Sequence, residues 1–211
     1  MLLTVVDYGV GNLRSIAKSI EKANSENNLN YLVKVSSDTK DVRKSDKIVL
    51  PGQGSFKACK EGIDNIKGLQ EELNESVLTK KKPIYGICAG MQLFATTGHE
   101  MEKTAGLNWI KGQVIKLDLG LSKLKIPHMG WNELKVENVS SVFKDLINKN
   151  HAYFIHSYEF IPEDKKNISV TTNYGKDVIA AVSFKNIYGS QFHPEKSQNT
   201  GIKILTNFLK L

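Results

Sequence analysis

Cysteine is scarce in this chain of 211 residues, which contains only Cys59 and Cys88. Two cysteines can form at most one disulfide, so a disulfide-stapled scaffold is excluded. A chain of this length with 40% hydrophobic residues can build a sizeable core without such a bridge. We therefore expect two free thiols, and a reactive one only where its surroundings favour the thiolate.

The sequence also lacks a run of about 18 apolar residues, which a membrane-spanning helix needs. Its first residues, Met1-Leu2-Leu3-Thr4-Val5-Val6-Asp7, have no basic region and reach an acidic residue too early for a secretory signal. We expect a cytoplasmic protein with no membrane partner. At about 100–200 residues per domain, the length predicts one domain that spans residues 1–211.

Acidic residues are outnumbered by basic ones, 22 against 29, which gives a formal net charge of +7. Such a balance raises the question of nucleic acid. The lysines are scattered, however, and the clusters Lys80-Lys81-Lys82 and Lys165-Lys166 are not interleaved with aromatic residues. We therefore expect no nucleic-acid partner, although an acidic protein or a phosphorylated metabolite is compatible with the charge.

Strands and helices alternate in the first half of the chain. Short apolar runs predict strands at 2–6, 31–35, 47–50 and 83–87, and helical spacing predicts helices at 13–22, 55–62 and 69–79. After about residue 105 the sequence changes to short strand-like pieces at 113–117, 133–136, 152–160, 168–172, 178–184 and 187–192, followed by an apolar helix at 200–209. The predicted fold class is α/β: an open, mostly parallel central sheet flanked by helices, plus a smaller antiparallel strand region in the second half. We expect chemistry at the carboxyl ends of the parallel strands.

The run Gly86-Ile87-Cys88-Ala89-Gly90 stands between a predicted strand and a stretch with helical spacing. This pattern is typical of a nucleophile elbow, a strained turn that needs residues almost without side chains two positions before and after the nucleophile. Gly86 and Gly90 occupy those positions. A helix that starts there also favours the thiolate, so Cys88 is the candidate nucleophile.

A cysteine nucleophile needs a general base, an acid that orients the base, and amide donors for the developing oxyanion. Among five histidines, only His193 has an acid in a short fixed relation to it, in His193-Pro194-Glu195. Pro194 ends the strand, so the imidazole and the carboxylate can both face the strand tip. The amides of Ala89, at the predicted helix start, and of Gly52, after a neighbouring strand, are the candidate oxyanion donors.

A cofactor site is not indicated. The run Gly9-x-Gly11-x-x-Arg14 lacks the third glycine of a dinucleotide fingerprint. We therefore expect no cofactor and no metal ion.

Three of these motifs together resemble the class I glutamine amidotransferase family, whose Cys-His-Glu triad sits on an α/β sheet. They are Pro51-Gly52-Gln53-Gly54, Gly86-Ile87-Cys88-Ala89-Gly90-Met91-Gln92 and Phe192-His193-Pro194-Glu195. Further segments are similar to the branch that supplies ammonia for imidazole glycerol phosphate synthesis: Asp7-Tyr8-Gly9-Val10-Gly11-Asn12-Leu13-Arg14-Ser15, Pro127-His128-Met129-Gly130-Trp131-Asn132, Tyr153-Phe154-Ile155-His156-Ser157-Tyr158 and His193-Pro194-Glu195-Lys196. The matches run from residue 4 to residue 200.

The resemblance implies an enzyme that hydrolyses glutamine to glutamate and ammonia with Cys88, His193 and Glu195. It also implies a set of residues that hold the glutamine: the side chains of Gln92 and Glu100, and the backbone of His156, Ser157 and Tyr158. Glu100 suits the substrate ammonium because it supplies a carboxylate. Gln92 lies four residues past Cys88 and so faces the same way on a helix.

The resemblance further implies a heterodimer with a (β/α)₈ cyclase subunit, which takes the ammonia and makes imidazole glycerol phosphate and aminoimidazole carboxamide ribotide in histidine biosynthesis. Residues that match positions near that interface are Asn12, His128, Met129, Trp131, Tyr153 and Lys196. Taken alone, the sequence favours ordinary core packing for Trp131 and Tyr153, and structural roles for His128 and His156.

Two other functions stay open. Paralogous subunits supply ammonia for surface-sugar biosynthesis with a different barrel partner, and the quoted motifs do not separate the two. A non-catalytic regulatory module is an alternative of another class. It would most simply have lost Cys88, His193 or Glu195, and all three are present.

Overall fold

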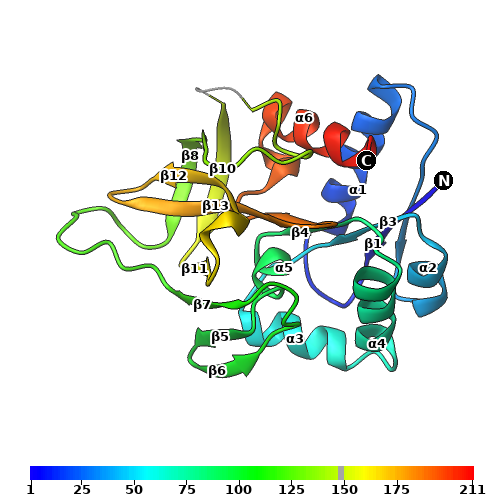
Figure 1. The fold of residues 1–211 in the computed structure, drawn as a ribbon, viewed down its shortest axis with the longest axis horizontal. Helices are drawn as coiled ribbons and strands as arrows, with labels where there is room; N and C mark the ends of the chain where they lie inside the picture. Colours follow the sequence, from blue (N-terminus) through cyan, green and yellow to red (C-terminus); the bar gives the residue numbers. More distant parts are fainter. Residues whose placement is uncertain (147–149) are drawn as a thin grey trace.

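An eight-stranded sheet with the order β2-β1-β3-β4-β14-β13-β12-β9 forms the centre of the computed structural model, which describes residues 1–146 and 150–211 (Figure 1). The strands from β2 to β14 are parallel to their neighbours, and the remaining pairs are antiparallel. The predicted fold class is confirmed. The strands are β1 (Leu2–Val6), β2 (Leu32–Ser36), β3 (Lys47–Leu50), β4 (Ile84–Ile87), β9 (Lys135–Val136), β12 (Ile168–Asn173), β13 (Asp177–Phe184) and β14 (Ile187–Ser190).

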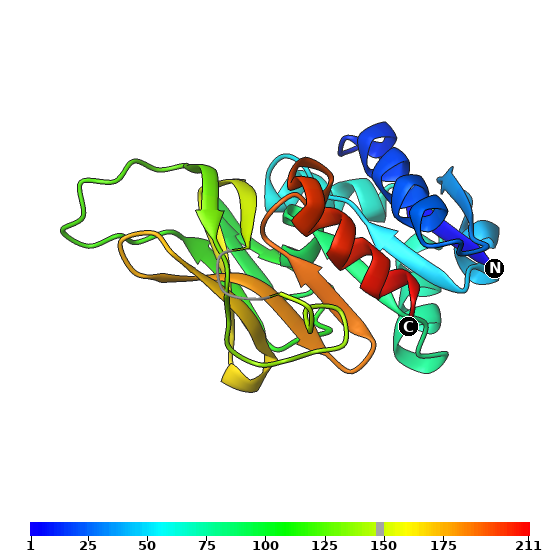
Figure 2. The ribbon, with the colours of Figure 1, turned by 90° about the horizontal axis from the view of Figure 1, so that it is seen from above.

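Helices cover both faces of the parallel part of this sheet (Figures 1 and 2). α1 (Leu13–Glu26) and α6 (Gln198–Leu209) lie on one face, and α2 (Thr39–Lys44), α3 (Phe56–Asp64) and α4 (Leu69–Asn74) lie on the other. α4 continues directly into a π-helical turn, Glu75–Thr79, and α5 (Ala89–Gln92) follows β4. No helix in the described ranges is both long and apolar enough to cross a membrane.

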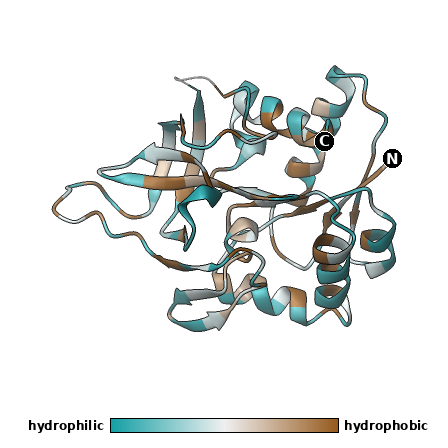
Figure 3. Cartoon of the chain, viewed as in Figure 1, coloured by the Kyte–Doolittle hydropathy of each residue, from teal (hydrophilic) through white to brown (hydrophobic). Residues whose placement is uncertain are grey.

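The strands are apolar on both faces because each face meets helices. Leu3 and Val5 of β1 pack in the same cluster as Ile16 and Ile20 of α1, whereas Val6 belongs to the cluster on the opposite face. This is the period of two that a strand imposes on its side chains. Figure 3 shows hydrophobic residues concentrated along the central strands, with hydrophilic residues on the outer helices.

In the described residues, two smaller sheets lie beside the central one, with strands that fall between residues 97 and 162. One pairs β8 (His128–Glu133) with β10 (His151–His156), and the other has the order β11-β7-β5-β6. The bounds of these strands are β5 (Thr97–Glu100), β6 (Glu102–Ala105), β7 (Gly112–Lys116) and β11 (Tyr158–Pro162). The predicted antiparallel region is therefore present.

One predicted strand is wrong in its extent. The run 152–160 is two strands in different sheets, because β10 pairs with β8 while β11 pairs with β7. The chain crosses between the sheets at Ser157, which belongs to neither strand. Apolar residues continue through the crossing, so the sequence pattern does not mark it.

Four elements were not predicted: α2, β5, β6 and β8. α2 is short and buries only Val42, so it has no apolar stripe, although Asp38 caps it by accepting from the Lys40 amide at 2.8 Å. β6 is largely exposed and its partner β5 only partly buried, which leaves no strong alternation to detect. Only the last residue of β8 falls within the predicted strand 133–136.

Neighbouring parallel strands bring distant segments to one edge of the sheet. β1, β3, β4 and β14 are adjacent, so their carboxyl ends lie together. The segments that leave those ends begin at Asp7, Pro51, Cys88 and Gln191. Each predicted catalytic motif therefore starts at this edge.

Candidate active site

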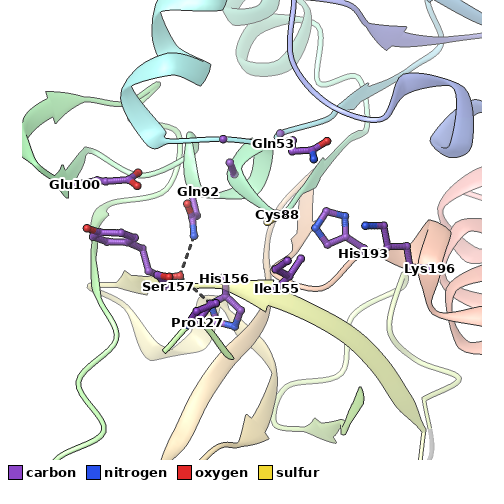
Figure 4. A pocket seen from close by; sticks show the side chains of 14 residues that line it. Gln53, Cys88, Gln92, Glu100, Pro127, Ile155, His156, Ser157, His193 and Lys196 are labelled. Atoms are coloured by element: carbon purple, nitrogen blue, oxygen red, sulfur yellow. Dashed lines mark hydrogen bonds between the residues drawn. The ribbon is translucent and has the colours of Figure 1, made fainter. Parts of the chain in front are cut away.

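A cavity of about 340 Å³ opens at the carboxyl edge of the sheet (Figure 4). Its lining residues are Gly52, Gln53, Gly54, Cys88, Ala89, Gln92, Glu100, Pro127, Ile155, His156, Ser157, Tyr158, His193 and Lys196. All the predicted catalytic and substrate-binding residues except Glu195 are in this lining. The volume lies at the lower end of the ~300–1,000 Å³ that is usual for small-molecule sites.

Cys88 stands on a strained turn between β4 and α5. Its φ of 53° and ψ of −115° lie in a region that residues with a side chain rarely adopt, at a cost of roughly 1–3 kcal/mol. The Cys88 amide donates to Ser190 O at 2.7 Å, and the Cys88 carbonyl accepts from Met91 and Gln92 at 3.1 Å each. These bonds hold the strained turn that the elbow pattern predicts.

The two glycines of the elbow are required by close backbone contacts. A Cβ atom on Gly86 would lie 2.7 Å from the Met91 Cα, and one on Gly90 would lie 2.1 Å from the Leu50 carbonyl oxygen. Neither neighbour is a flexible side chain. The strand and helix can therefore approach as they do only when both positions are glycine.

His193 and Glu195 form a buried pair beside Cys88. Nδ1 of His193 lies 2.8 Å from Oε1 of Glu195, and Pro194 opens a 3₁₀ turn, Pro194–Lys196, that brings the carboxylate back toward the ring. The His193 amide donates to Tyr153 O at 3.0 Å, and Ser197 Oγ donates to the His193 carbonyl at 2.6 Å. The ring is thus positioned from the backbone as well as from Glu195.

The charge state of His193 is set by its two partners. Burial by itself would lower the pKa of His193, but hydrogen bonds and charge interactions with Cys88 and Glu195 outweigh it and raise that pKa to about 10. An imidazolium between a sulfur and a carboxylate is therefore the favoured form at neutral pH. Figure 4 shows Cys88 with Gln92 and His193 on either side of it.

The segment that carries Gly52 lies directly against the elbow. A Cβ atom on Gly52 would lie 1.9 Å from the Gly90 amide nitrogen. The Pro51 carbonyl, which precedes Gly52, accepts a hydrogen bond from the hydroxyl of Tyr8. Burial raises the pKa of that hydroxyl well above its ordinary value, so it stays protonated. The thiol of Cys59 lies 3.8 Å from the Gln53 carbonyl and donates to it. The buried side chains of Tyr8 and Cys59 therefore hold the carbonyl groups of Pro51 and Gln53, the residues before and after Gly52.

Cys59 itself is enclosed in the core. It is buried and free, as is Cys88, so the predicted absence of a disulfide is confirmed for both cysteines. Burial raises the pKa of Cys59 to about 11, which keeps it a thiol at neutral pH.

Glu100 and Gln92 both line the cavity, and Figure 4 shows Gln92 between Glu100 and Cys88. Oε2 of Glu100 accepts from the Phe56 amide at the start of α3, at 2.7 Å. Nε2 of Gln92 donates to the Tyr158 carbonyl at 3.0 Å and to Oε1 of Gln191 at 2.9 Å. Both side chains are thus held by the protein in fixed orientations.

His156 and His128 lie next to each other beneath the cavity. Nδ1 of His128 is 3.0 Å from Nε2 of His156, and the His128 ring stacks between Phe154 and Tyr174, with ring centroids 4.5 and 4.0 Å away. Burial lowers the pKa of His128 to about 4 and that of His156 to about 3. Both rings are therefore neutral at physiological pH.

The residues that we expected near a partner divide into two groups. Met129 and Trp131 are 59% and 49% exposed on β8, and Trp131 meets Tyr153 edge to face at 6.1 Å. Nζ of Lys196 lies 5.7 Å from the Tyr153 ring centroid and also lines the cavity, so these side chains lead from the surface to the site. Asn12 caps α1 through its side chain.

His128 does not belong to that exposed group. It is only 2% exposed and points to the opposite side of β8 from Met129 and Trp131. The alternation of a strand explains this placement, because residues one and three positions apart lie on opposite faces. His128 supports the surface from below and does not reach it.

Two site residues were missed in the sequence, Tyr8 and Gln191. Gln191 is completely buried, and its Nε2 lies 3.6 Å from Sγ of Cys88. Its position just before Phe192-His193 is the sequence feature that places it at the strand tip. Tyr8 had no such feature, because its contact with Pro51 depends on the pairing of β1 with β3.

Comparisons with known proteins show the family. A family model described as "Glutamine amidotransferase class-I" matches residues 4–211. "Imidazole glycerol phosphate synthase subunit HisH" of Pelagibacter ubique is 49% identical over 211 residues, which cover 100% of both chains. The protein of the same name from Rhodopseudomonas palustris is 43% identical over 213 residues, covering 100% of this chain and 99% of that one.

Solved structures show the same fold at low identity. A crystal structure of a glutamine amidotransferase has a TM-score of 0.71 and 15% identity, and covers 99% of each chain. A glutamine amidotransferase from Thermotoga maritima has a TM-score of 0.62 and 17% identity, and covers 92% of this chain and 76% of that one. Because the family model matches residues 4–211 and full-length relatives are 43% and 49% identical, the chain belongs to the class I glutamine amidotransferase family.

Proposed function

We propose that the protein is the glutaminase subunit of an imidazole glycerol phosphate synthase, in which it hydrolyses glutamine to glutamate and ammonia for histidine biosynthesis. The observation that carries the proposal is the placement of Cys88 on a strained elbow beside the buried pair of His193 and Glu195. Relatives that bear the name of this subunit along the whole chain favour the histidine pathway over surface-sugar amination.

Glutamine enters the cavity with its carboxamide toward Cys88. Glu100 meets the substrate ammonium, and Gln92, together with the backbone of His156, Ser157 and Tyr158, holds the rest of the amino acid. All five line the cavity. A carboxylate already fixed by the Phe56 amide offers a pre-organised partner for a cation.

The thiolate of Cys88 attacks the side-chain carbonyl carbon, and the electrons of the carbonyl move to oxygen. The amides of Gly52 and Ala89 stabilise that oxyanion. His193, which holds the thiol proton, gives it to the leaving nitrogen, and ammonia departs to leave a γ-glutamyl thioester. Water, deprotonated by the same imidazole, then hydrolyses the thioester to glutamate and restores the thiolate.

Ammonia that reached water would be protonated and lost as a nucleophile. We therefore propose that it passes to a (β/α)₈ cyclase subunit docked over Met129, Trp131, Tyr153, Lys196 and Asn12, with His128 supporting the surface from below. The exposure of Met129 and Trp131 next to the cavity supports this face. The assembly is a heterodimer in the cytoplasm, and the chain contributes one amidotransferase domain to it.

The test is a glutaminase assay of the wild type and of Cys88→Ala, with and without the cognate cyclase and its nucleotide substrate. We expect low activity for the isolated wild type, a rise of at least about tenfold in the loaded complex, and none for Cys88→Ala. Restoration of growth in a histidine auxotroph that lacks this subunit checks the pathway. Activity in Cys88→Ala would refute the cysteine mechanism, and failed complementation by an active protein would favour the sugar pathway.

A further inference from the structure

Gln191 sits between the nucleophile and Gln92 without lining the cavity. It follows β14, whose last residue Ser190 is in register with Ile87 of β4, so the next residues on the two strands, Gln191 and Cys88, meet at the strand tips. Its backbone amide donates to Ala180 O at 2.8 Å. The side chain is completely buried and contacts Cys88 Sγ through Nε2 and Gln92 through Oε1.

The direction of these hydrogen bonds follows from the Tyr158 carbonyl, which can only accept. Gln92 must turn its NH₂ group toward that oxygen, 3.0 Å away. The same nitrogen lies 2.9 Å from Gln191, which must therefore present its oxygen. Only the NH₂ group of Gln191 is then left to face Cys88, so the sulfur receives a hydrogen-bond donor. A reversed Gln191 amide would place two NH₂ groups together.

The Tyr158 carbonyl is fixed from its other side as well. Nδ1 of His156 donates to it at 2.9 Å, and Nε2 of His156 accepts from Nδ1 of His128 at 3.0 Å. His128 in turn accepts from Nδ2 of Asn132 at 3.3 Å. Since burial keeps both rings neutral, each has a single tautomer in this chain of bonds. The orientation of Gln191 is thus supported by groups well removed from the sulfur.

We propose that Gln191 is a further catalytic residue of the site, whose side-chain N–H stabilises the Cys88 thiolate while its oxygen holds Gln92 in line with the nucleophile. The inference rests on the proposed cysteine mechanism and adds a donor to it. A hydrogen bond to an ion is stronger than one to a neutral group, and the Gln191 amide that donates it is completely buried and so shielded from water. The amide has no proton to lose at physiological pH, so it stabilises the thiolate without competing with His193 for the proton.

The test compares Gln191→Met, which keeps the shape and removes the donor, with Gln191→Glu, which places a carboxylate near the sulfur. Alkylation of Cys88 by iodoacetamide is followed from pH 4 to 9 by mass spectrometry of the peptide that carries it. Loss of a hydrogen bond to a charged group lowers the ratio of thiolate to thiol at a given pH about tenfold, which equals about 1.4 kcal/mol. We expect the acidic limb of the alkylation profile to move up by about one pH unit in Gln191→Met, and further in Gln191→Glu.

The matched control is Asn207→Leu on α6. Nδ2 of Asn207 is another buried amide donor, and it donates to Val142 O at 3.1 Å. This variant should keep the wild-type profile. In the 15N-labelled wild type, the side-chain NH₂ resonance of Gln191 should also shift along the acidic limb, whereas that of the exposed Gln113 on β7 should not. An unchanged profile in both variants would overturn the role of Gln191, as would an unchanged resonance if the variants do not fold. Glutamine turnover by Cys88→Ala would instead refute the cysteine mechanism itself, so the two failures are distinguishable.

Discussion

Nδ1 of His193 lies 2.8 Å from Oε1 of Glu195, and the two side chains are only 9% and 1% exposed. A carboxylate can only accept, so the Nδ1 atom carries the proton, and in the proposed mechanism the Nε2 atom exchanges a proton with Cys88. Glu195 therefore has two effects: it selects the ring orientation, and its charge stabilises the imidazolium.

Glu195→Gln keeps the shape and removes the charge. We expect kcat for glutamine to fall by about a hundredfold or more, because proton transfer by a positioned base contributes about 10²–10⁴. KM should change little, since Glu195 does not line the cavity. Steady-state kinetics measures both. Glu163→Gln, an exposed change, is the control, and equal kcat in Glu195→Gln and wild type would contradict the role of the carboxylate.

Acid should destabilise the fold through His128 and His156, the two buried histidines whose pKa values are lowered, and not through His193, whose pKa is raised. The pKa values of His156 and His128 are lowered to about 3 and about 4, while an unfolded histidine titrates near 6.5. Below about pH 6.5 these two histidines bind protons in the unfolded chain but not in the folded chain, so the free energy of unfolding falls as the pH falls. We expect the free energy of unfolding to drop by about 3 kcal/mol between pH 7 and pH 5.

Urea unfolding at several pH values measures that slope. His156→Gln removes one of the two groups and should show a clearly smaller loss toward pH 5, although it starts from a lower stability. His99→Gln changes an exposed histidine and should follow the wild type. The same slope in His156→Gln as in the wild type would assign the acid sensitivity to other groups.

The glycine frame of the elbow should not tolerate a side chain. In Gly90→Ala the added Cβ would lie 2.1 Å from the Leu50 carbonyl, so β3 or the elbow must move, and we expect a loss of at least about 3 kcal/mol together with loss of activity. Gly120 has a φ of +55°, but no atom lies near a Cβ added there. Gly120→Ala should therefore lower the free energy of unfolding by only about 1–2 kcal/mol. Thermal unfolding separates the two. Gly90 has no left-handed φ, so a loss in Gly90→Ala no larger than in Gly120→Ala would mean that the contact with β3 is not what makes Gly90 necessary.

The exposed residues of β8 should bind the partner. Trp131→Ala removes a large side chain that is 49% exposed, so we expect little change in stability but a loss of affinity for the cyclase of about tenfold or more. Leu32→Ala is the control, because Leu32 is 67% exposed on β2, at the opposite edge of the central sheet from β9. Titration calorimetry of each variant with the cyclase gives the affinity. An unchanged affinity in Trp131→Ala would place the partner elsewhere.

The elbow and the His-Pro-Glu turn were predictable because each is a local backbone requirement. Gly86, Cys88 and Gly90 lie within five residues, and their spacing alone encodes the contact between strand and helix. The alternation of strands with helices then predicts a parallel sheet, and adjacent parallel strands bring their carboxyl ends together. Local patterns thus predicted the fold class and the candidate nucleophile.

Residues whose roles depend on strand pairing were not predictable. Gln191 contacts Cys88 only because β14 pairs with β4 in a particular register, and Tyr8 contacts Pro51 only because β1 pairs with β3. The resemblance placed His128 near the partner interface, and because β8 was not predicted, the sequence did not show on which face of a strand His128 lies. Had that strand been recognised, the alternation of His128 with Met129 and Trp131 would have placed it on the inner face.

Covalent capture of the substrate tests the proposed chemistry most directly. Glutamine is mixed with the wild-type protein and the loaded cyclase, the reaction is quenched in acid within one turnover, and the peptide that carries Cys88 is examined by mass spectrometry. We predict one γ-glutamyl group on Cys88 as a thioester, which hydroxylamine removes, and no adduct in Cys88→Ala. Steady release of glutamate with no adduct on Cys88, or from Cys88→Ala, would contradict the proposed function.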